Sequence, residues 1–167
     1  MLNWNSYNFV LNNVKKNGIY LEYASYELKN NKNIVFEAVK KNYHALYYAS
    51  DELKNDREFI LQIVKHNGLA LEFVSKNLKN DFEIVLNAVK DYGYALISAS
   101  DELKNNKIIV LEAFKENCDI FLYASNKLKN DEKYILELYK IHNYILMYIS
   151  EELKNNKQFI YIMKHRN

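Results

Sequence analysis

The sequence predicts an all-α fold, an α-solenoid of short helical repeats stacked with a constant period. The tripeptide Leu-Lys-Asn returns every 53 − 28 = 25 residues, beginning at Leu28, Leu53, Leu78, Leu103, Leu128 and Leu153. The three glycines of the chain share one position of this repeat, and six serines share another. Because a fixed period in this range is typical of stacked supersecondary units, we expect a right-handed superhelix built from one repeating element.

The repeat register divides the chain, residues 1–167, into about six and a half units of a single domain. The units run over 6–30, 31–55, 56–80, 81–105, 106–130 and 131–155, followed by a half unit at 156–167. Extending the register backwards places Trp4 where later units have the lysine of the tripeptide. One unit is too small to bury a core, so each is expected to depend on its neighbours for stability.

Each unit is expected to open with an amphipathic helix, here called helix A. In the unit 56–80, Asp56 is expected to cap a helix near 57–66, whose apolar face is made by Phe59, Ile60, Leu61, Ile63 and Val64. Asn67 and Gly68 then predict a left-handed helix stop, since glycine adopts positive φ without strain. Gly18 and Gly93 occupy the same position.

A shorter apolar segment follows, helix B, at 69–74 in this unit, and it is too short to be stable without packing. A serine is then expected to cap a third helix of a single turn, at Ser25, Ser50, Ser75, Ser100, Ser125 and Ser150. The leucine of the tripeptide is expected to enter the core. Its asparagine is expected to bond backbone groups at the turn into the next unit.

The unit Asp-x-x-Phe/Ile-Val/Ile-Leu-x-Ala-Val-Lys-x-Asn-Gly-x-Ala-Leu-x-x-Ala-Ser-x-x-Leu-x-Asn resembles the repeat family known as domain of unknown function 4116. The resemblance covers nearly the whole chain and is best over 31–56 and 81–106, whereas Cys118, Asp119 and Ile120 and the unit 131–155 depart from it. It implies short tandem helices and brings no assigned chemistry.

Composition narrows the classes of protein. Twenty-three basic and 21 acidic side chains leave a formal charge of +2, so the overall charge predicts no strong attraction to nucleic acid. The lone Cys118 excludes an internal disulfide. The first residues lack the pattern of a signal peptide, and no apolar run is long enough to span a bilayer, so we expect no membrane partner and a cytoplasmic location in the source cell or its host.

We expect a non-enzymatic protein without metal or cofactor. The four histidines, His44, His66, His142 and His165, fall at different positions of the repeat and show no metal-ligand spacing. Cys118 lies in the glycine position with no activating partner evident. The glycines serve helix ends rather than a phosphate loop, and the acids Glu37, Glu112 and Glu137 share an outward position that predicts a solvated face.

Two rows of lysines give a nucleic-acid-binding hypothesis. One row ends helix A, at Lys40, Lys65, Lys90, Lys115 and Lys140 with Lys15 before them, and the other lies in the tripeptide. Stacked units would align each row, and aligned lysines could follow a phosphate backbone while tyrosines stack on bases. The competing interpretation is structural, because lysines suit helix C-termini and Glu27, Glu52, Glu102 and Glu152 would neutralise the second row.

The protein-binding hypothesis depends on one row of helix B that turns apolar along the array: Glu22, Tyr47, Glu72, Ile97, Leu122 and Met147. With Tyr94 and Tyr144 it predicts an apolar strip for a partner, made by Tyr94, Ile97, Leu122, Tyr144 and Met147. The alternative is that curvature of the array buries the row there. A neighbouring aromatic row, Tyr23, Tyr48, Phe73, Tyr123 and Tyr148, is expected to lie in the core or at its edge.

Protein binding is therefore the leading hypothesis, with an RNA- or DNA-binding solenoid as the alternative. A third hypothesis is a small inhibitor encoded by a phage or other mobile element, anti-CRISPR-like, that blocks a host defence enzyme by binding it. Dimerisation through the apolar strip or through exposed end units is a further expectation.

Overall fold

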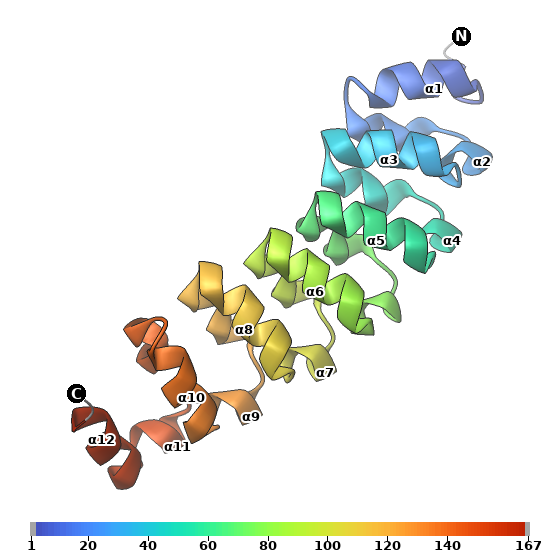
Figure 1. Cartoon of the computed structure of the whole chain (residues 1–167). Helices are drawn as coiled ribbons and strands as arrows, with labels where there is room; N and C mark the ends of the chain where they lie inside the picture. The colour runs from blue at the N-terminus through green and yellow to red at the C-terminus, as the bar shows by residue number, and fades with distance from the viewer. Residues whose placement is uncertain (1–2, 166–167) are drawn as a thin grey trace.

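The computed structural model describes residues 3–165, apart from the side chain of Lys164, so the end of the expected half unit lies outside the described residues. Within this range the chain forms twelve α-helices and seven 3-10 helices and no strand. Figure 1 shows an elongated staircase in which successive units stack side by side and the two chain ends lie far apart. The predicted all-α solenoid is confirmed, and the handedness of its superhelix stays a prediction.

Each unit contributes three elements in a fixed order. Helix A is an α-helix, at α1 (Tyr7–Val14), α3 (Lys32–Lys41), α5 (Arg57–His66), α6 (Phe82–Asp91), α8 (Lys107–Glu116), α10 (Glu132–Tyr139) and α12 (Lys157–Lys164). Helix B is a 3-10 helix, at η1 (Gly18–Tyr23), η2 (Tyr43–Tyr48), η3 (Gly68–Phe73), η5 (Gly93–Ser98), η6 (Cys118–Tyr123) and η7 (Asn143–Met147). A single turn closes the unit, at α2 (Tyr26–Lys29), α4 (Asp51–Lys54), η4 (Leu78–Asn80), α7 (Asp101–Lys104), α9 (Asn126–Lys129) and α11 (Glu151–Lys154).

Helix A follows the sequence pattern closely. The side chain of Asp56 accepts a hydrogen bond from the backbone N–H of Phe59 at 2.9 Å, so the predicted N-cap is confirmed. The inner face of α5 is fully buried at Ile60, Ile63 and Val64. The helices A of successive units pack on each other, α1 on α3 and α5 on α6, and form one row. The 3-10 helices form a second row beside it. The tripeptide leucines enter this core as expected: Leu53, Leu78, Leu103, Leu128 and Leu153 are buried and Leu28 is partly buried.

The predicted left-handed helix stop is wrong. No described residue has positive φ, glycines included. Helix α5 ends instead at Asn67, whose backbone is extended at φ −155° and ψ 106°, and whose side chain accepts from the N–H of Leu69 at 3.0 Å. The same asparagine therefore ends helix A and caps the 3-10 helix, and the turn needs no glycine.

Glycine is required because backbones of adjacent units approach closely. A Cβ built on Gly18 or Gly68 would collide with the backbone carbonyl oxygen of a residue 20 positions later, and a Cβ on Gly93 would lie 2.7 Å from that of Ala113. Each glycine faces an alanine, in the pairs Gly18–Ala38, Gly68–Ala88 and Gly93–Ala113. Where the unit has no glycine, the residue 20 positions later is larger, in the pairs Tyr43–Ile63, Cys118–Leu138 and Asn143–Met163. Small residues thus occur in pairs, at the junctions where helix A packs against the preceding 3-10 helix.

A second contact between units joins the serine to the preceding tripeptide. The N–H of Ser50 donates to the carbonyl of Lys29 at 3.0 Å, and the Ser50 hydroxyl donates to Asn30 Oδ1 at 2.6 Å while capping Leu53. The same contacts recur at Ser75, Ser100, Ser125 and Ser150. The tripeptide asparagine was expected to bond backbone, and Asn155 does, donating to the carbonyl of Glu151 at 2.8 Å. In the other five units its side-chain oxygen accepts from the serine 20 residues later, because stacking brings that serine within reach.

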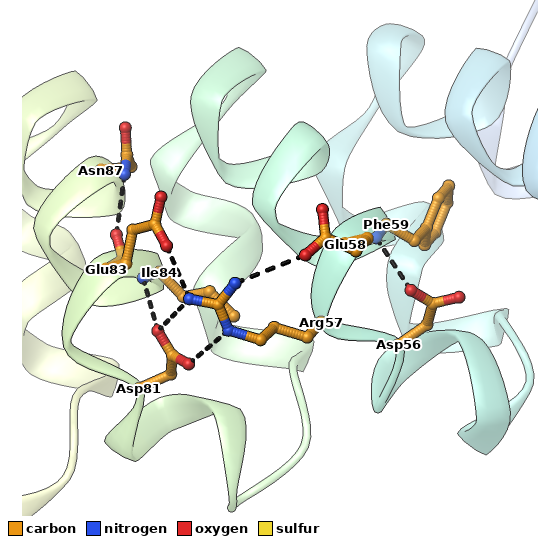
Figure 2. A network of polar contacts seen from close by, with 8 residues as sticks. All are labelled: Asp56, Arg57, Glu58, Phe59, Asp81, Glu83, Ile84 and Asn87. Atoms are coloured by element: carbon orange, nitrogen blue, oxygen red, sulfur yellow. Dashed lines mark hydrogen bonds and ion pairs between the residues drawn. The ribbon is translucent and has the colours of Figure 1, made fainter.

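A third contact is an ion pair between successive helix A N-termini. Figure 2 shows Arg57, at the start of α5, reaching Asp81 and Glu83 of the next unit, with Nε 2.8 Å from Asp81 Oδ2 and Nη2 2.6 Å from Glu83 Oε2. Equivalent pairs join Lys32 to Asp56 at 2.5 Å and Lys107 to Asp131 at 2.7 Å. The remaining N-caps of helix A after the first are asparagines, and there the preceding unit offers no base, in the pairs Tyr7–Asn31, Phe82–Asn106 and Glu132–Asn156.

Candidate partner-binding surface

The outer face of the 3-10 helices is the candidate site. In a 3-10 helix residues three apart share one side, so the second and fifth positions of each helix B point the same way. The residue at the fifth position is exposed in every unit, and in the first three units it is Glu22, Tyr47 and Glu72. Its apolar members stay exposed too, with 42% of Ile97, 55% of Leu122 and 65% of Met147 accessible. The alternative that curvature buries this row is therefore wrong.

The two tyrosines of the apolar strip differ. Tyr144 is 66% exposed, beside Met147 on the same 3-10 helix. Tyr94 is partly buried against the core, its hydroxyl accepts from Asn117 Nδ2 at 3.0 Å, and its ring lies 5.6 Å from that of Tyr92. Tyr94 is thus a wall of the strip, held in place by its own chain, whereas the other members offer free side-chain surface.

The N-terminal half of the same face carries an aromatic cluster that the sequence analysis did not single out. The ring of Phe73 lies 5.6 Å from His44 and 6.0 Å from Tyr47, and Tyr47 meets Tyr48 edge-on at 5.2 Å. With Ile19 these four side chains line a hollow of about 350 Å³. The signal available was the set of aromatic residues at adjacent helix B positions in units 31–55 and 56–80.

The sixth position of helix B was expected in the core or at its edge, and the outcome is mixed. Tyr48, Phe73 and Tyr148 are partly buried against the core, but Tyr23 and Tyr123 are exposed. Tyr148 donates its hydroxyl to Asp119 Oδ1 of the preceding unit at 2.5 Å, and this bond raises the pKa of Tyr148 to about 12.

The lysines that end helix A are all exposed, one per unit. Lys40 pairs with Glu37 at 2.9 Å and Lys115 with Glu112 at 2.8 Å. Two of the three outward acids of helix A therefore neutralise the lysine of the same helix. Within the part of the chain that the structure describes, the other predicted members, Lys65, Lys90 and Lys140, make no ion pair.

Acids neutralise the tripeptide lysines in part, because Lys54 pairs with Asp51 at 3.3 Å and Lys154 with Glu151 at 2.7 Å, although these are not the glutamates that were expected. Lys79 donates to the backbone carbonyl of Glu72 at 2.7 Å and Lys129 to that of Leu122 at 2.6 Å. Burial lowers the pKa of both ammonium groups. The expected neutralising glutamates instead bond the preceding unit, with Glu52 accepting from Tyr26, Glu102 from Asn80 and Glu152 from Asn130.

Groups able to do chemistry are dispersed. Burial raises the pKa of the Cys118 thiol, and its bond to Asp119 adds to this, which disfavours the reactive thiolate. Each histidine lies against an aromatic ring, His66 on Phe36 and His142 on Phe114 among them. Over residues 3–165 no group of three or more His, Cys, Asp or Glu side chains could hold a metal ion. No helix in the same range is long and apolar enough to cross a bilayer.

The two ends of the array are built differently. At the start, Trp4 packs against Phe9 at 5.1 Å and Tyr23 at 5.2 Å, which covers the first unit with rings. At the other end, an apolar hollow of about 270 Å³ is lined by Leu146, Ile149, Lys154, Phe159, Ile160 and Met163. The positions equivalent to Ile160 are fully buried in the earlier units. Self-association through this end stays a prediction.

Comparison with known proteins identifies the repeat. The family model described as Domain of unknown function (DUF4116) matches the chain over residues 7–54, 56–104, 83–129 and 131–163. These overlapping matches cover nearly all of the described units. No curated protein and no solved structure matches the chain.

Proposed function

Since the chain belongs to the DUF4116 family of helical repeats, we propose that it is a non-enzymatic scaffold that binds a protein partner through the outer face of its 3-10 helices. The observation that carries this proposal is the exposure of Ile97, Leu122 and Met147 at equivalent positions of three consecutive units. Water-facing positions of a stable repeat do not need apolar side chains, and the same position is acidic at Glu22 and Glu72.

The strip has the properties of an interface centre. Burying a fully exposed side chain of this kind is worth about 1.5–3 kcal/mol, and these three are about half exposed, so covering each is worth about half of that. Together they supply a useful part of a micromolar interaction. They project from short helices that are held by the contacts between units, so little conformational freedom is lost on binding. Tyr144 adds an exposed ring, the kind of side chain that is enriched at interface hot spots.

The test is a capture experiment with three proteins. The variant Ile97→Ser, Leu122→Ser, Met147→Ser removes the strip, and Ile108→Ser, Ile141→Ser, Tyr161→Ser removes as many exposed apolar side chains away from it. Partners pulled down from the native host by the parent are expected to be lost with the first variant and kept with the second. Equal capture by all three folded proteins would refute the proposal.

A second candidate function is nucleic-acid binding through the lysine row of helix A. The observation that favours it is the register of exposed, unpaired ammonium groups at Lys65, Lys90 and Lys140. If the row follows a phosphate backbone, binding weakens steeply with salt, and changing these three lysines to alanine lowers the salt slope by about 3. Filter binding with RNA and DNA that detects no retention at low salt would eliminate this candidate.

A further inference from the structure

One unit lacks an aromatic ring that all the others have. The sixth position of helix B is Tyr or Phe in five units and serine in the fourth, and the set reads Tyr23, Tyr48, Phe73, Ser98, Tyr123 and Tyr148. Ser98 is partly exposed at the end of η5. The exception falls beside Ile97, at the start of the apolar strip.

In two of these units, the ring contacts the 3-10 helix of the preceding unit. Phe73 contacts the rings at the first, second and fifth positions of η2, which are Tyr43, His44 and Tyr47, at 6.2, 5.6 and 6.0 Å. Tyr148 bonds the second position of η6 through Asp119. The repeat therefore defines where a ring at position 98 would lie, above Leu69 and Glu72, the second and fifth positions of η3.

A hollow occupies that place. It measures about 320 Å³ and is lined by Leu69, Glu72, Tyr94, Ala95, Ile97 and Ser98. Leu69 and Ile97 offer apolar walls, Tyr94 is fixed by its bond to Asn117, and the exposed carboxylate of Glu72 is an acceptor at the rim. Leu69, Tyr94, Ile97 and Ser98 occupy the same repeat positions as Ile19, His44, Tyr47 and Tyr48, which line the aromatic hollow. The hollow at position 98 differs because its own unit contributes serine where the other contributes the Tyr48 ring.

We propose that this hollow, the Ser98 pocket, receives a tyrosine side chain of the protein partner. The ring takes the place that Phe73 and Tyr148 fill in their own units. Its hydroxyl donates to the carboxylate of Glu72, at the fifth position of η3, whereas Tyr148 donates to Asp119 at the second position of η6. The pocket rests on the proposed function for its partner, since it opens on the same face as the strip. The Ser98 pocket makes the fourth unit the anchoring point of the partner, and Ile97 belongs to both the pocket and the apolar strip.

The direct test uses a small probe in place of the partner. N-acetyl-tyrosinamide is titrated into the protein while the methyl signals of Leu69 and Ile97 are followed by NMR. We expect saturable shifts at these methyls with a Kd on the order of 1 mM, as befits a single ring in a half-open pocket. N-acetyl-leucinamide, without a ring, is expected to bind at least several-fold more weakly. Absence of saturable shifts at Leu69 and Ile97, or equal binding of both probes, would overturn the proposal.

The blocking variant is Ser98→Tyr, which the repeat itself recommends because five units fold with an aromatic residue there. It is expected to keep or raise the Tm and to abolish the probe shifts, whereas Ser98→Thr leaves both unchanged. Ser98→Leu fills the pocket with a smaller group, so the blocking test survives if the tyrosine variant folds poorly. Unchanged probe binding in a folded Ser98→Tyr protein would show that the probe lies elsewhere and would refute the site.

The outcomes separate this inference from the proposed function. If the strip variant loses its partner but the probe does not bind the Ser98 pocket, the face binds a protein and the tyrosine anchor is wrong. If the probe binds and the strip variant keeps its partner, the pocket exists and the strip is wrong.

Discussion

The junctions between units and the outer face of the 3-10 helices obey opposite rules. At the junctions, residues 20 or 24 positions apart are matched, glycine with alanine, serine with asparagine, and Asp N-caps with a base. On the outer face the fifth helix B position varies from Glu22 to Tyr47 to Met147. The contrast teaches that the repeating positions build the scaffold, while the variable ones are free to carry a function.

The largest effect is expected where backbones touch. Gly68→Val would force a side chain into the carbonyl of Ala88, and we expect a loss of about 3 kcal/mol or more in unfolding free energy, measured by urea titration. Cys118→Ala, at the same repeat position without a glycine, is the control and should change stability by under about 1 kcal/mol. A Gly68→Val protein as stable as the parent would contradict the close-approach account.

A smaller loss is expected from the serine contact. Ser100→Ala removes the cap on the N–H of Leu103 and the bond to Asn80, which should cost about 1–2 kcal/mol. Ser25 makes no cap bond with its own helix, so Ser25→Ala should cost clearly less in the same urea titration. Equal losses at both serines would show that the cap and the contact between units contribute little.

The ion pair of Arg57 should matter less still, because it is partly exposed to solvent. Asp81→Asn keeps a competent N-cap but breaks the pair with Arg57, and we expect a loss of about 0.5–1 kcal/mol. Adding Arg57→Phe recreates the Phe82–Asn106 combination of the next junction and should recover part of that loss. A double variant less stable than Asp81→Asn alone would argue against matching at this position.

The same pairs predict a dependence of stability on pH. The hydrogen bond from Lys32 lowers the pKa of Asp56, and that from Lys107 lowers the pKa of Asp131. Burial works to raise the pKa of Asp81, but Arg57 outweighs it and the net shift is downward. A carboxylate with a depressed folded pKa stabilises the protein above its unfolded pKa, here near 3.8, and this contribution is lost as pH falls through the folded value. The urea concentration at the unfolding midpoint should therefore decrease as the pH is lowered below about 3.8. Replacing all three aspartates by asparagine should make this decrease with pH smaller.

Much of the scaffold could be predicted from the sequence because its signals are local. The cap at Asp56 follows from residues close to it in the chain, the burial of the tripeptide leucine follows from the short repeat pattern, and both predictions were correct, with Leu28 partly buried and the other five leucines buried in the core. The glycine position was recognised, but its reason was misassigned, since the obstacle at Gly68 is the carbonyl of Ala88 in the next unit. The pairing of residues 20 and 24 apart is visible in the sequence only once stacking shows which positions face each other.

Only part of the candidate site could be predicted, because it too depends on contacts between units. Periodicity placed Ile97, Leu122 and Met147 in one row, but exposure or burial of that row depended on curvature. The aromatic hollow around Tyr47 and Phe73 arises between units, so no single unit predicts it. The serine at position 98 was passed over in the sequence analysis, because its consequence depends on where a ring at that position would lie relative to Leu69 of the preceding unit.

The measurement that tests the central claim most directly pairs stability with partner capture in the strip variant. Ile97→Ser, Leu122→Ser, Met147→Ser should lower the free energy of unfolding, measured by urea titration, by no more than about 1 kcal/mol per site, because about half of each side chain already faces water. The same protein should lose the partners that the parent captures. Retained capture at unchanged stability would contradict the division between scaffold and binding face, as would a large loss of stability, because it would place these residues in the scaffold.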